Sequence, residues 1–192
     1  NTKLNGSFCD TIFGHNNPFN YQITIGEATR IAKNKLYNDE NKLPYILLGD
    51  PALRLNYPTD YQIKTTHTFD TLQALTTQTI KGYIQAPDHD TAYWFNGKLD
   101  VTIFDKIQNI TTRDNDELVE ENKKRITYTD YPNTLFVGQT DVKNGVFEIT
   151  FMVPKDIRYN YGNGRIVYYA YDNATQEEAI GHFEDFTIGG TS

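Results

Sequence analysis

The stretch that decides the fold is Tyr45–Leu55, which reads Y-I-L-L-G-D-P-A-L-R-L. An apolar run meets a Gly-Asp-Pro turn, and a second short apolar run follows before a break at Pro58. A continuous apolar run bounded by turn residues is typical of a strand that is buried on both faces. We therefore predict a buried strand over residues 43–48, of the kind found in α/β sheets.

The residues before this strand predict a helix over 24–37. Thr24 is a good N-cap, and Glu27 follows three residues later, as in a capping box. Apolar side chains then recur at helical spacing as far as Leu36. Residues 1–22 are polar and rich in Asn, with four candidate apolar anchors: Phe8, Ile12, Phe13 and Phe19.

Helix, loop and buried strand together form the last unit of an α/β sheet. The 57 residues up to Tyr57 are too few to build an α/β domain with its own core. We therefore predict that residues 1–57 are the end of a larger domain, and that a second domain covers 58–192.

The second domain has the pattern of a β protein. Alternating apolar residues and regular turn signals predict about eight strands, over 63–69, 77–84, 97–104, 125–131, 135–142, 145–153, 165–171 and 179–188. Asn144-Gly145 predicts a tight hairpin, Gly162-Asn163-Gly164 predicts a turn, and polar residues 109–124 predict a long exposed loop. We predict a mainly β fold, an immunoglobulin-like β-sandwich over 58–192.

Composition agrees with this fold class and limits the function. The chain has 192 residues with 14 Tyr and 11 Phe, which favour strands. A net charge of -7 argues against nucleic acid as a partner, because phosphate binding needs clustered Lys and Arg. The sequence contains no run of about 18 apolar residues, so it predicts no membrane-spanning helix. The lone Cys9 cannot form an internal disulfide.

Two sets of residues invite a catalytic or binding interpretation. Cys9 and His15 could form a thiol–imidazole pair, but catalytic Cys and His usually come from separate strand ends, so a structural thiol is favoured. Asp50 could bind a cation, but an Asp-Pro step favours a capped turn.

The candidate metal ligands have equally simple alternatives. Asp88-His89-Asp90 and the acidic residues 114–121 could ligate a metal, but both are best interpreted as solvated loops, the second lacking a calcium-loop pattern. His67 and His182 lie in predicted strands as packed or surface imidazoles. No phosphate-binding loop is present in the sequence. We expect no metal and no cofactor.

Aromatic residues suggest an alternative function. Tyr83, Tyr93 and Trp94 could form a carbohydrate platform, although the strand position of Tyr83 favours a core or inter-sheet role for it. The alternative to an enzyme fragment is therefore a surface adhesin or carbohydrate-binding sandwich, with Tyr93, Trp94 and the acidic loop as its contact region.

Several segments resemble a known family. Ile25-Gly26-Glu27-Ala28 and Leu47–Leu55 resemble the end of the caspase-like domain of gingipain-type cysteine peptidases, family C25. The second half resembles the domain that follows it in the type IX secretion sortases of the Bacteroidetes. The segments that carry this second resemblance are Gly97–Val101, Leu135–Gly138, Gly145–Phe147, Phe151–Ile157, Gly162–Ile166, Tyr169–Tyr171, Ala179–Gly181 and Ile188–Gly190.

The resemblance implies an exported cysteine endopeptidase that removes C-terminal sorting signals from secreted proteins at the outer membrane or cell surface. The family's catalytic Cys and His lie upstream, and no residue here matches them, so the resemblance implies an inactive piece of a longer protein. Asp50, Pro51, Tyr57 and Pro58 would lie at the joint between the two domains.

The resemblance also suggests partners. The upstream peptidase domain and proteins of the secretion machinery are the expected ones. Without the rest of its sheet, residues 46–48 would expose apolar surface, and the open strand edge could pair with another copy of the chain.

Overall fold

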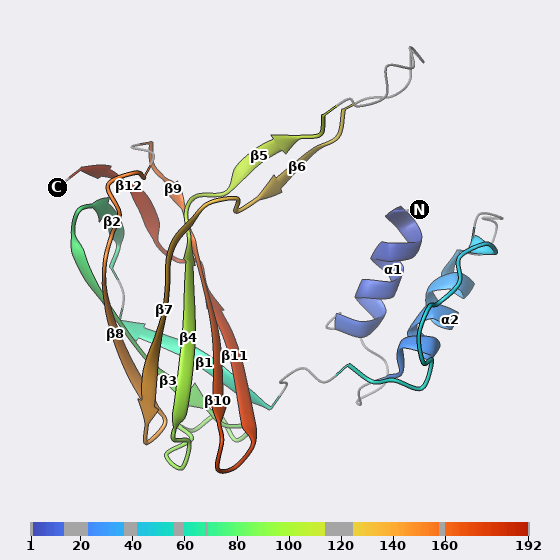
Figure 1. Cartoon of the computed structure of the whole chain (residues 1–192), viewed down its shortest axis with the longest axis horizontal. Helices are drawn as coiled ribbons and strands as arrows, with labels where there is room; N and C mark the ends of the chain where they lie inside the picture. The colour runs from blue at the N-terminus through green and yellow to red at the C-terminus, as the bar shows by residue number, and fades with distance from the viewer. Residues whose placement is uncertain are drawn as a thin grey trace. The chain divides into compact units, whose positions relative to one another are not determined.

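The computed structural model describes residues 2–13, 23–36, 42–55, 60–67, 69–113, 125–157 and 160–191. The chain divides into two compact units, Asn1–Tyr57 and Pro58–Ser192. The first unit contains the helices and the second contains the strands, so the mainly β prediction is confirmed (Figure 1). Neither helix is long and apolar enough to cross a membrane, within the residues that the structure describes.

The first unit holds α1 (Thr2–Phe13) and α2 (Ile25–Lys35). The strands of the second unit are β1 (Tyr61–His67), β2 (Thr71–Ala74), β3 (Thr77–Gln85), β4 (Gly97–Phe104), β5 (Gln108–Thr111), β6 (Thr127–Asp130), β7 (Thr134–Lys143), β8 (Val146–Met152), β9 (Gly162–Asn163), β10 (Arg165–Asp172), β11 (Glu177–Phe183) and β12 (Thr187–Thr191).

Seven strands of the second unit form a closed barrel in the order β1-β11-β10-β4-β7-β8-β3. Strand β1 closes it, because β1 pairs in parallel with β11 and antiparallel with β3. An immunoglobulin-like sandwich has two separate sheets, and the hydrogen bonding here gives one continuous ring instead. That finer part of the prediction is not confirmed.

The barrel encloses one apolar core. Alternate residues of its strands point inward, as the burial of Leu99, Val101 and Ile103 along β4 shows. A separate sheet of β2, β12 and β9 adds Leu72 and Ile188 to the same core. The second unit therefore completes its hydrophobic core with its own residues.

The hairpin signal at Asn144-Gly145 is confirmed. Lys143 and Val146 are paired across β7 and β8, which leaves a two-residue turn. Asn144 has φ 51° and Gly145 has φ 72°, the pair of positive values that a type I′ turn requires.

The sequence-based strand boundaries need four corrections. Gly162-Asn163 is the short strand β9, because it pairs with β12, and is not simply a turn. The predicted strand over 179–188 is split between β11 and β12. Strand β2 was not predicted. The predicted loop over 109–124 begins with three residues of β5, and residues 114–124 lie outside the described part of the chain.

In the first unit the predicted helix is confirmed as α2. The Thr24 side chain accepts a hydrogen bond from the Glu27 backbone N–H at 3.2 Å. The Glu27 carboxylate pairs with Arg30 at 2.6 Å. The half of the predicted capping box that the structure shows is therefore the bond to the Thr24 side chain.

Helix α1 was missed. Leu4, Phe8 and Ile12 lie on one face at a spacing of four residues, and Leu4 and Ile12 are buried. Thr11 is buried beside them, and its hydroxyl donates to the Ser7 carbonyl at 2.7 Å. The high Asn content hid this helical pattern.

The predicted buried strand over 43–48 is wrong. Residues 45–48 have no regular secondary structure. Ile46 is 80% exposed and Leu48 is 92% exposed. The apolar run is suited to a sheet, but no described strand pairs with it, so Ile46 and Leu48 remain in solvent.

Asp172 fixes one end of the barrel. Its buried carboxylate accepts hydrogen bonds from the backbone N–H groups of Asn96 at 2.9 Å and Ala174 at 2.8 Å. The bond from Asn96 is the main reason that the pKa of Asp172 lies below its usual value. The ionised carboxylate therefore joins the loop before β4 to the β10–β11 hairpin.

We expect Asp172→Asn to lower the free energy of unfolding of the second unit by about 1–3 kcal/mol at neutral pH, since an amide group would face two N–H donors. A lowered folded-state pKa stabilises the protein above the unfolded pKa of about 4, and this contribution is lost as the pH falls. Urea unfolding at several pH values should show the difference from the wild type narrowing below about pH 4. Asp141→Asn, which removes an exposed partner of Lys98, is the control and should have a much smaller effect. An equal loss of stability in both variants would contradict this assignment.

Candidate functional site

The Gly-Asp-Pro turn binds the N-terminus of α2. The backbone N–H of Ile25 donates to the Leu53 carbonyl at 2.9 Å, and that of Gly26 donates to the Pro51 carbonyl at 3.0 Å. A helix begins with N–H groups that have no partner within the helix. The segment 51–53 and the Thr24 side chain together satisfy the first three of them.

Asp50 forms the turn itself. Its carboxylate accepts a hydrogen bond from the Ala52 N–H at 2.8 Å, and its carbonyl accepts one from the Leu53 N–H at 3.1 Å. This geometry agrees with the favoured interpretation of Asp50 as a turn cap. Among the described residues, no group of three or more His, Cys, Asp or Glu could hold a metal ion near Asp50 or elsewhere.

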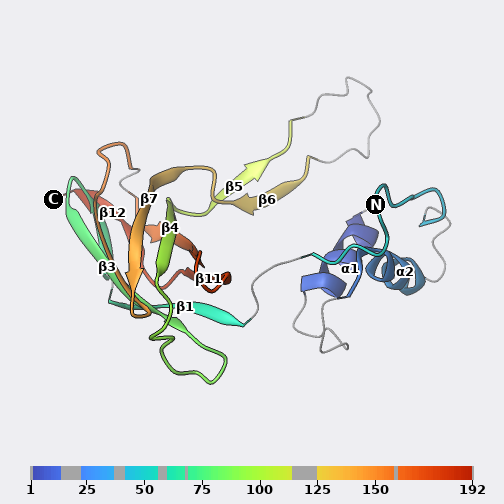
Figure 2. The same cartoon turned by 60° about the horizontal axis from the view of Figure 1, so that its bottom comes forward.

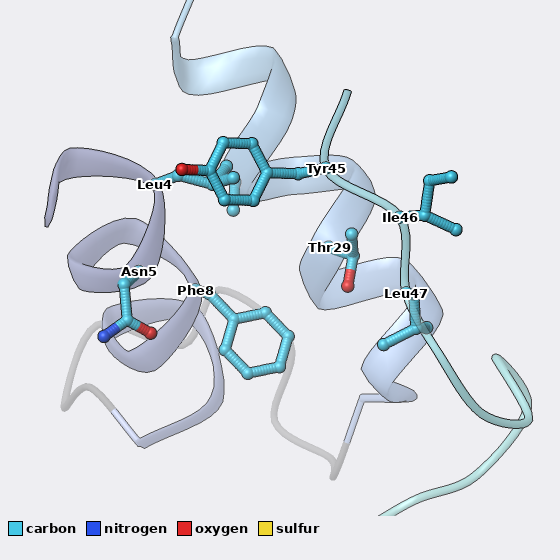
Figure 3. Close-up of a pocket in the computed structure, with 8 residues that line it drawn as sticks. Leu4, Asn5, Phe8, Thr29, Tyr45, Ile46 and Leu47 are labelled. Atoms are coloured by element: carbon cyan, nitrogen blue, oxygen red, sulfur yellow. The ribbon is translucent and has the colours of Figure 1, made fainter. Parts of the chain in front are cut away.

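An apolar cleft of about 330 Å³ lies between the two helices and residues 45–47. Figure 3 shows Tyr45 lying beside Leu4, with Phe8 and Leu47 directed into the same space and Ile46 directed away. Most of the described residues that line it are apolar, and Asn5 and Thr29 add polar side chains. The cleft therefore has the character of an incompletely filled core.

The two faces of segment 45–48 have different surroundings. Leu47 is half-buried on the helix side, whereas Ile46 and Leu48 are exposed on the other side. Lys33 donates to the Tyr45 carbonyl at 2.5 Å, which holds the segment beside α2. The segment is thus fixed with one apolar face covered by helices and the other face open.

The structure describes only one member of the candidate catalytic pair. Cys9 is free and half-buried on α1, and its thiol is 3.9 Å from the Asn5 side-chain oxygen one turn earlier. His15 lies outside the described residues, as do Tyr57 and Pro58 of the predicted joint. The part of the joint that the structure describes is Asp50 and Pro51.

The other candidate ligands are separated or turned outward. Asp88, His89 and Asp90 form an exposed turn, in which the Asp88 carboxylate accepts from the Asp90 N–H at 3.2 Å. His182 is exposed on β11 and His67 lies in β1. The acidic residues 114–121 lie outside the described part of the chain.

The aromatic candidates do not form one platform. Tyr93 is 67% exposed and Trp94 is 50% exposed, in the loop before β4. Tyr83 is half-buried on β3, on the face opposite the core residues Ile80 and Ile84, so its predicted core role is wrong.

Sequence reasoning missed the Glu177 cluster. The Glu177 carboxylate accepts hydrogen bonds from Tyr61 at 2.5 Å and from the Trp94 indole N–H at 3.1 Å. Burial of Tyr61, followed by its bond to Glu177, raises the pKa of the tyrosine. Tyr61 and Glu177 are 116 positions apart in sequence, so only the barrel topology brings them together.

The first unit defines the class of protein. Residues 1–56 match the model of peptidase family C25, so the first unit is similar to this family of cysteine peptidases.

Comparison with solved structures then gives a particular relative. The chain is similar to dimeric latent PorU from Porphyromonas gingivalis, with 30% identity over 88% of this chain and a TM-score of 0.58. It spans 17% of the PorU chain. The gingipain-like and PorU-like character predicted from the sequence is therefore confirmed.

Other comparisons add little. The sporulation control protein Spo0M from Bacillus subtilis aligns with 69% of this chain and 50% of its own chain, at 10% identity and a TM-score of 0.41. That similarity is too low to support a conclusion. No curated protein matches the sequence.

The contact between α2 and the Gly-Asp-Pro turn can be tested with two helix glycines. A Cβ at Gly26 would lie 2.6 Å from the Pro51 Cβ and 2.7 Å from its carbonyl oxygen. We expect Gly26→Ala to destabilise the first unit by about 1–3 kcal/mol through overpacking, despite the better helix propensity of Ala.

Gly6→Ala on α1 is the matched control, because nothing lies within 4 Å of a Cβ there. It should stabilise the helix by up to about 1 kcal/mol. The free energy of unfolding of both variants can be measured by urea unfolding. The helical circular dichroism signal, which comes from the first unit, follows the transition. Stabilisation by Gly26→Ala would refute the close contact.

Proposed function

We propose that this chain is the non-catalytic end of an exported C25 sortase, joining the last part of the peptidase domain to a β-domain that supports it. The observation that carries the proposal is segment 45–48, with apolar side chains on both faces and cover on only one. A strand of a parallel sheet has both faces buried, so this segment is suited to lie inside a larger sheet. A preceding peptidase domain would supply that sheet.

The small core of the first unit supports the same proposal. Its cluster of buried residues, within the described range, consists of Ile12, Ile23 and Ala28, with four partly buried neighbours. A cluster of this size is much smaller than the core of an independent domain. The unit is therefore better understood as a surface layer of a larger domain.

The proposed parent removes C-terminal sorting signals from secreted proteins at the outer membrane or cell surface. Its partners are the upstream peptidase domain and proteins of the secretion machinery. In this role Asp50 and Pro51 hold the exit of the sheet against α2, and Tyr57 and Pro58 lead into the β-domain. Pairing of the open segment with another copy of the chain stays a prediction.

A carbohydrate-binding or adhesin role is the second candidate. It is favoured by the exposure of Tyr93 and Trp94. The bond between Trp94 and Glu177 gives that indole a structural role as well. The proposal for a sortase fragment has the additional support of the family match.

We expect the chain to have no thiol-peptidase activity. Peptides carrying C-terminal sorting signals should remain intact when incubated with the chain under reducing conditions, as judged by mass spectrometry. Cys9→Ala should behave identically, because the thiol has no described imidazole beside it. Cleavage by the wild type that disappears in Cys9→Ala would disprove the proposal.

The exposed segment gives a second test. Ile46→Lys combined with Leu48→Lys should change the free energy of unfolding by less than about 0.5 kcal/mol, since both side chains are in solvent. The same variant should bind much less of a hydrophobic fluorescent dye.

Val137→Lys combined with Met152→Lys is the matched control, because these exposed side chains lie on the β-domain. It should leave most of the dye binding intact. Unfolding of the helices by the Ile46 and Leu48 substitutions would show that the segment is buried, and would remove the basis of the proposal.

A further inference from the structure

The strands of the barrel are not paired to the same extent all the way round. Strand β1 is paired with β11, and β7 with β8, over only two residues each. The other neighbouring strands of the ring are paired over five to eight residues. The ring therefore consists of two well-paired halves, β8-β3-β1 and β7-β4-β10-β11, which meet at two short seams.

The seam between β7 and β8 is closed by the chain itself, because the Asn144-Gly145 turn joins these two strands. The backbone N–H of Gly145 donates to the Phe95 carbonyl at 2.9 Å, and its carbonyl accepts from the Ile84 N–H at 2.7 Å. Ile84 belongs to β3 and Phe95 lies just before β4, so the turn is bonded to both halves. This seam is a fixed corner.

The seam between β1 and β11 has no turn across it. Its backbone pairing consists of Tyr61 with Ala179 and Gln62 with Ile180. Figures 1 and 2 show β1 running obliquely to β4 and β7, so it follows the edge of their sheet for only a short distance. The pairing stops at Gly181, where a Cβ would lie 2.5 Å from the Ile63 carbonyl oxygen.

Side chains close this seam at the Tyr61 end. One oxygen of the Glu177 carboxylate accepts from the Tyr61 hydroxyl at 2.5 Å. The other oxygen accepts from the Trp94 indole N–H and the Thr175 hydroxyl, both at 3.1 Å. Hydrogen bonds to a carboxylate are stronger than those between neutral groups. The bond from Tyr61 therefore reinforces a seam that has little backbone pairing.

We propose that the barrel opens at the seam between β1 and β11, with the bond from Tyr61 to Glu177 as the latch that keeps it shut. Local opening takes place where few bonds must break, and two backbone pairs are fewer than the five that join β1 to β3. Tyr61 is half-buried and Gln62 is exposed, so opening at this end leaves the buried Ile63 in the core.

The place of β1 in the sequence gives the latch a role. Strand β1 is the first strand after the boundary between the two units, which lies between Tyr57 and Pro58. A displacement of the chain before Pro58 reaches the latch before it reaches any other strand. Opening frees the backbone edge of β11 at Ala179 and Ile180, and a free strand edge can pair with another strand. The latch is thus a conformational device that links the unit boundary to the availability of the β11 edge.

A third strand contact limits how far the seam opens. The hydroxyl groups of Thr65 on β1 and Tyr168 on β10 are 3.0 Å apart. Tyr168 is buried, so this bond lies within the core of the barrel. Opening therefore begins at Tyr61 and stops short of Thr65.

Hydrogen exchange of the full chain, measured by mass spectrometry, tests the proposal. Glu177→Gln and Tyr61→Phe should each raise the exchange rate of amides in residues 61–67 and 177–183 by about tenfold, the effect of losing one hydrogen bond to a charged group. Amides in residues 97–104 and 134–143, on the other strands of the larger half, should exchange at the wild-type rate.

Glu178→Gln is the matched control. The Glu178 carboxylate accepts from the Tyr169 hydroxyl at 2.6 Å, which is the same kind of bond one residue further along. Both of these residues belong to the β10–β11 hairpin, so this bond does not cross the seam. The variant should exchange like the wild type in residues 61–67.

A cross-link gives the reverse test. In a Cys9→Ser background, Gln62→Cys combined with Ile180→Cys places thiols on two exposed residues that are paired across the seam. Their disulfide should restore slow exchange to the Glu177→Gln variant.

Three results would overturn the proposal. The first is exchange at the wild-type rate in both latch variants, and the second is equal acceleration in all strands of the barrel or in the Glu178→Gln control. The third is fast exchange that persists in the cross-linked chain.

Discussion

Closure of the barrel by β1 is the constraint on which the second unit depends. Strand β1 is hydrogen-bonded to β3 along five residue pairs and to β11 along two. Without β1, the outer edges of β3 and β11 would both be open, and unpaired edges are sites of uncontrolled pairing. Closure converts seven short strands into a continuous wall around the core. The bond from Tyr61 to Glu177 fixes the first residue of β1 to the last hairpin of the ring.

The first unit lacks a closure of this kind. Its helices pack on each other and on one face of segment 45–48, and the Gly-Asp-Pro turn satisfies the N-terminus of α2. These contacts fix the backbone but leave Ile46 and Leu48 in solvent. The two units therefore differ: within the described residues, the β-domain buries its apolar core side chains, whereas the helical unit leaves Ile46 and Leu48 exposed.

Much of this architecture could be predicted from the sequence, because the signals are local. Each of these signals determines the structure of residues that are close to it in sequence. Examples are the alternation in β4, the Asn144-Gly145 turn and the Thr24 cap. Helix α1 was missed because abundant Asn obscured the spacing of Leu4 and Phe8. The barrel closure and the Glu177 cluster depend on residues far apart in sequence, which local patterns cannot bring together.

The apolar run at 45–48 was interpreted as a buried strand, and the exposure of Ile46 and Leu48 shows why that interpretation failed. The pattern of apolar side chains indicates the surroundings to which a segment is suited. The secondary structure that the segment adopts depends on the neighbours that are present. A continuous run, as at 45–48, is suited to cover on two faces, which a sheet between two layers provides. The two-stranded sheet of β5 and β6 alternates instead, so it is suited to cover on one face only. Within the described residues, the two exposed surfaces therefore differ in kind: the pattern of residues 45–48 is suited to cover on two faces, and that of the β5–β6 sheet to cover on one.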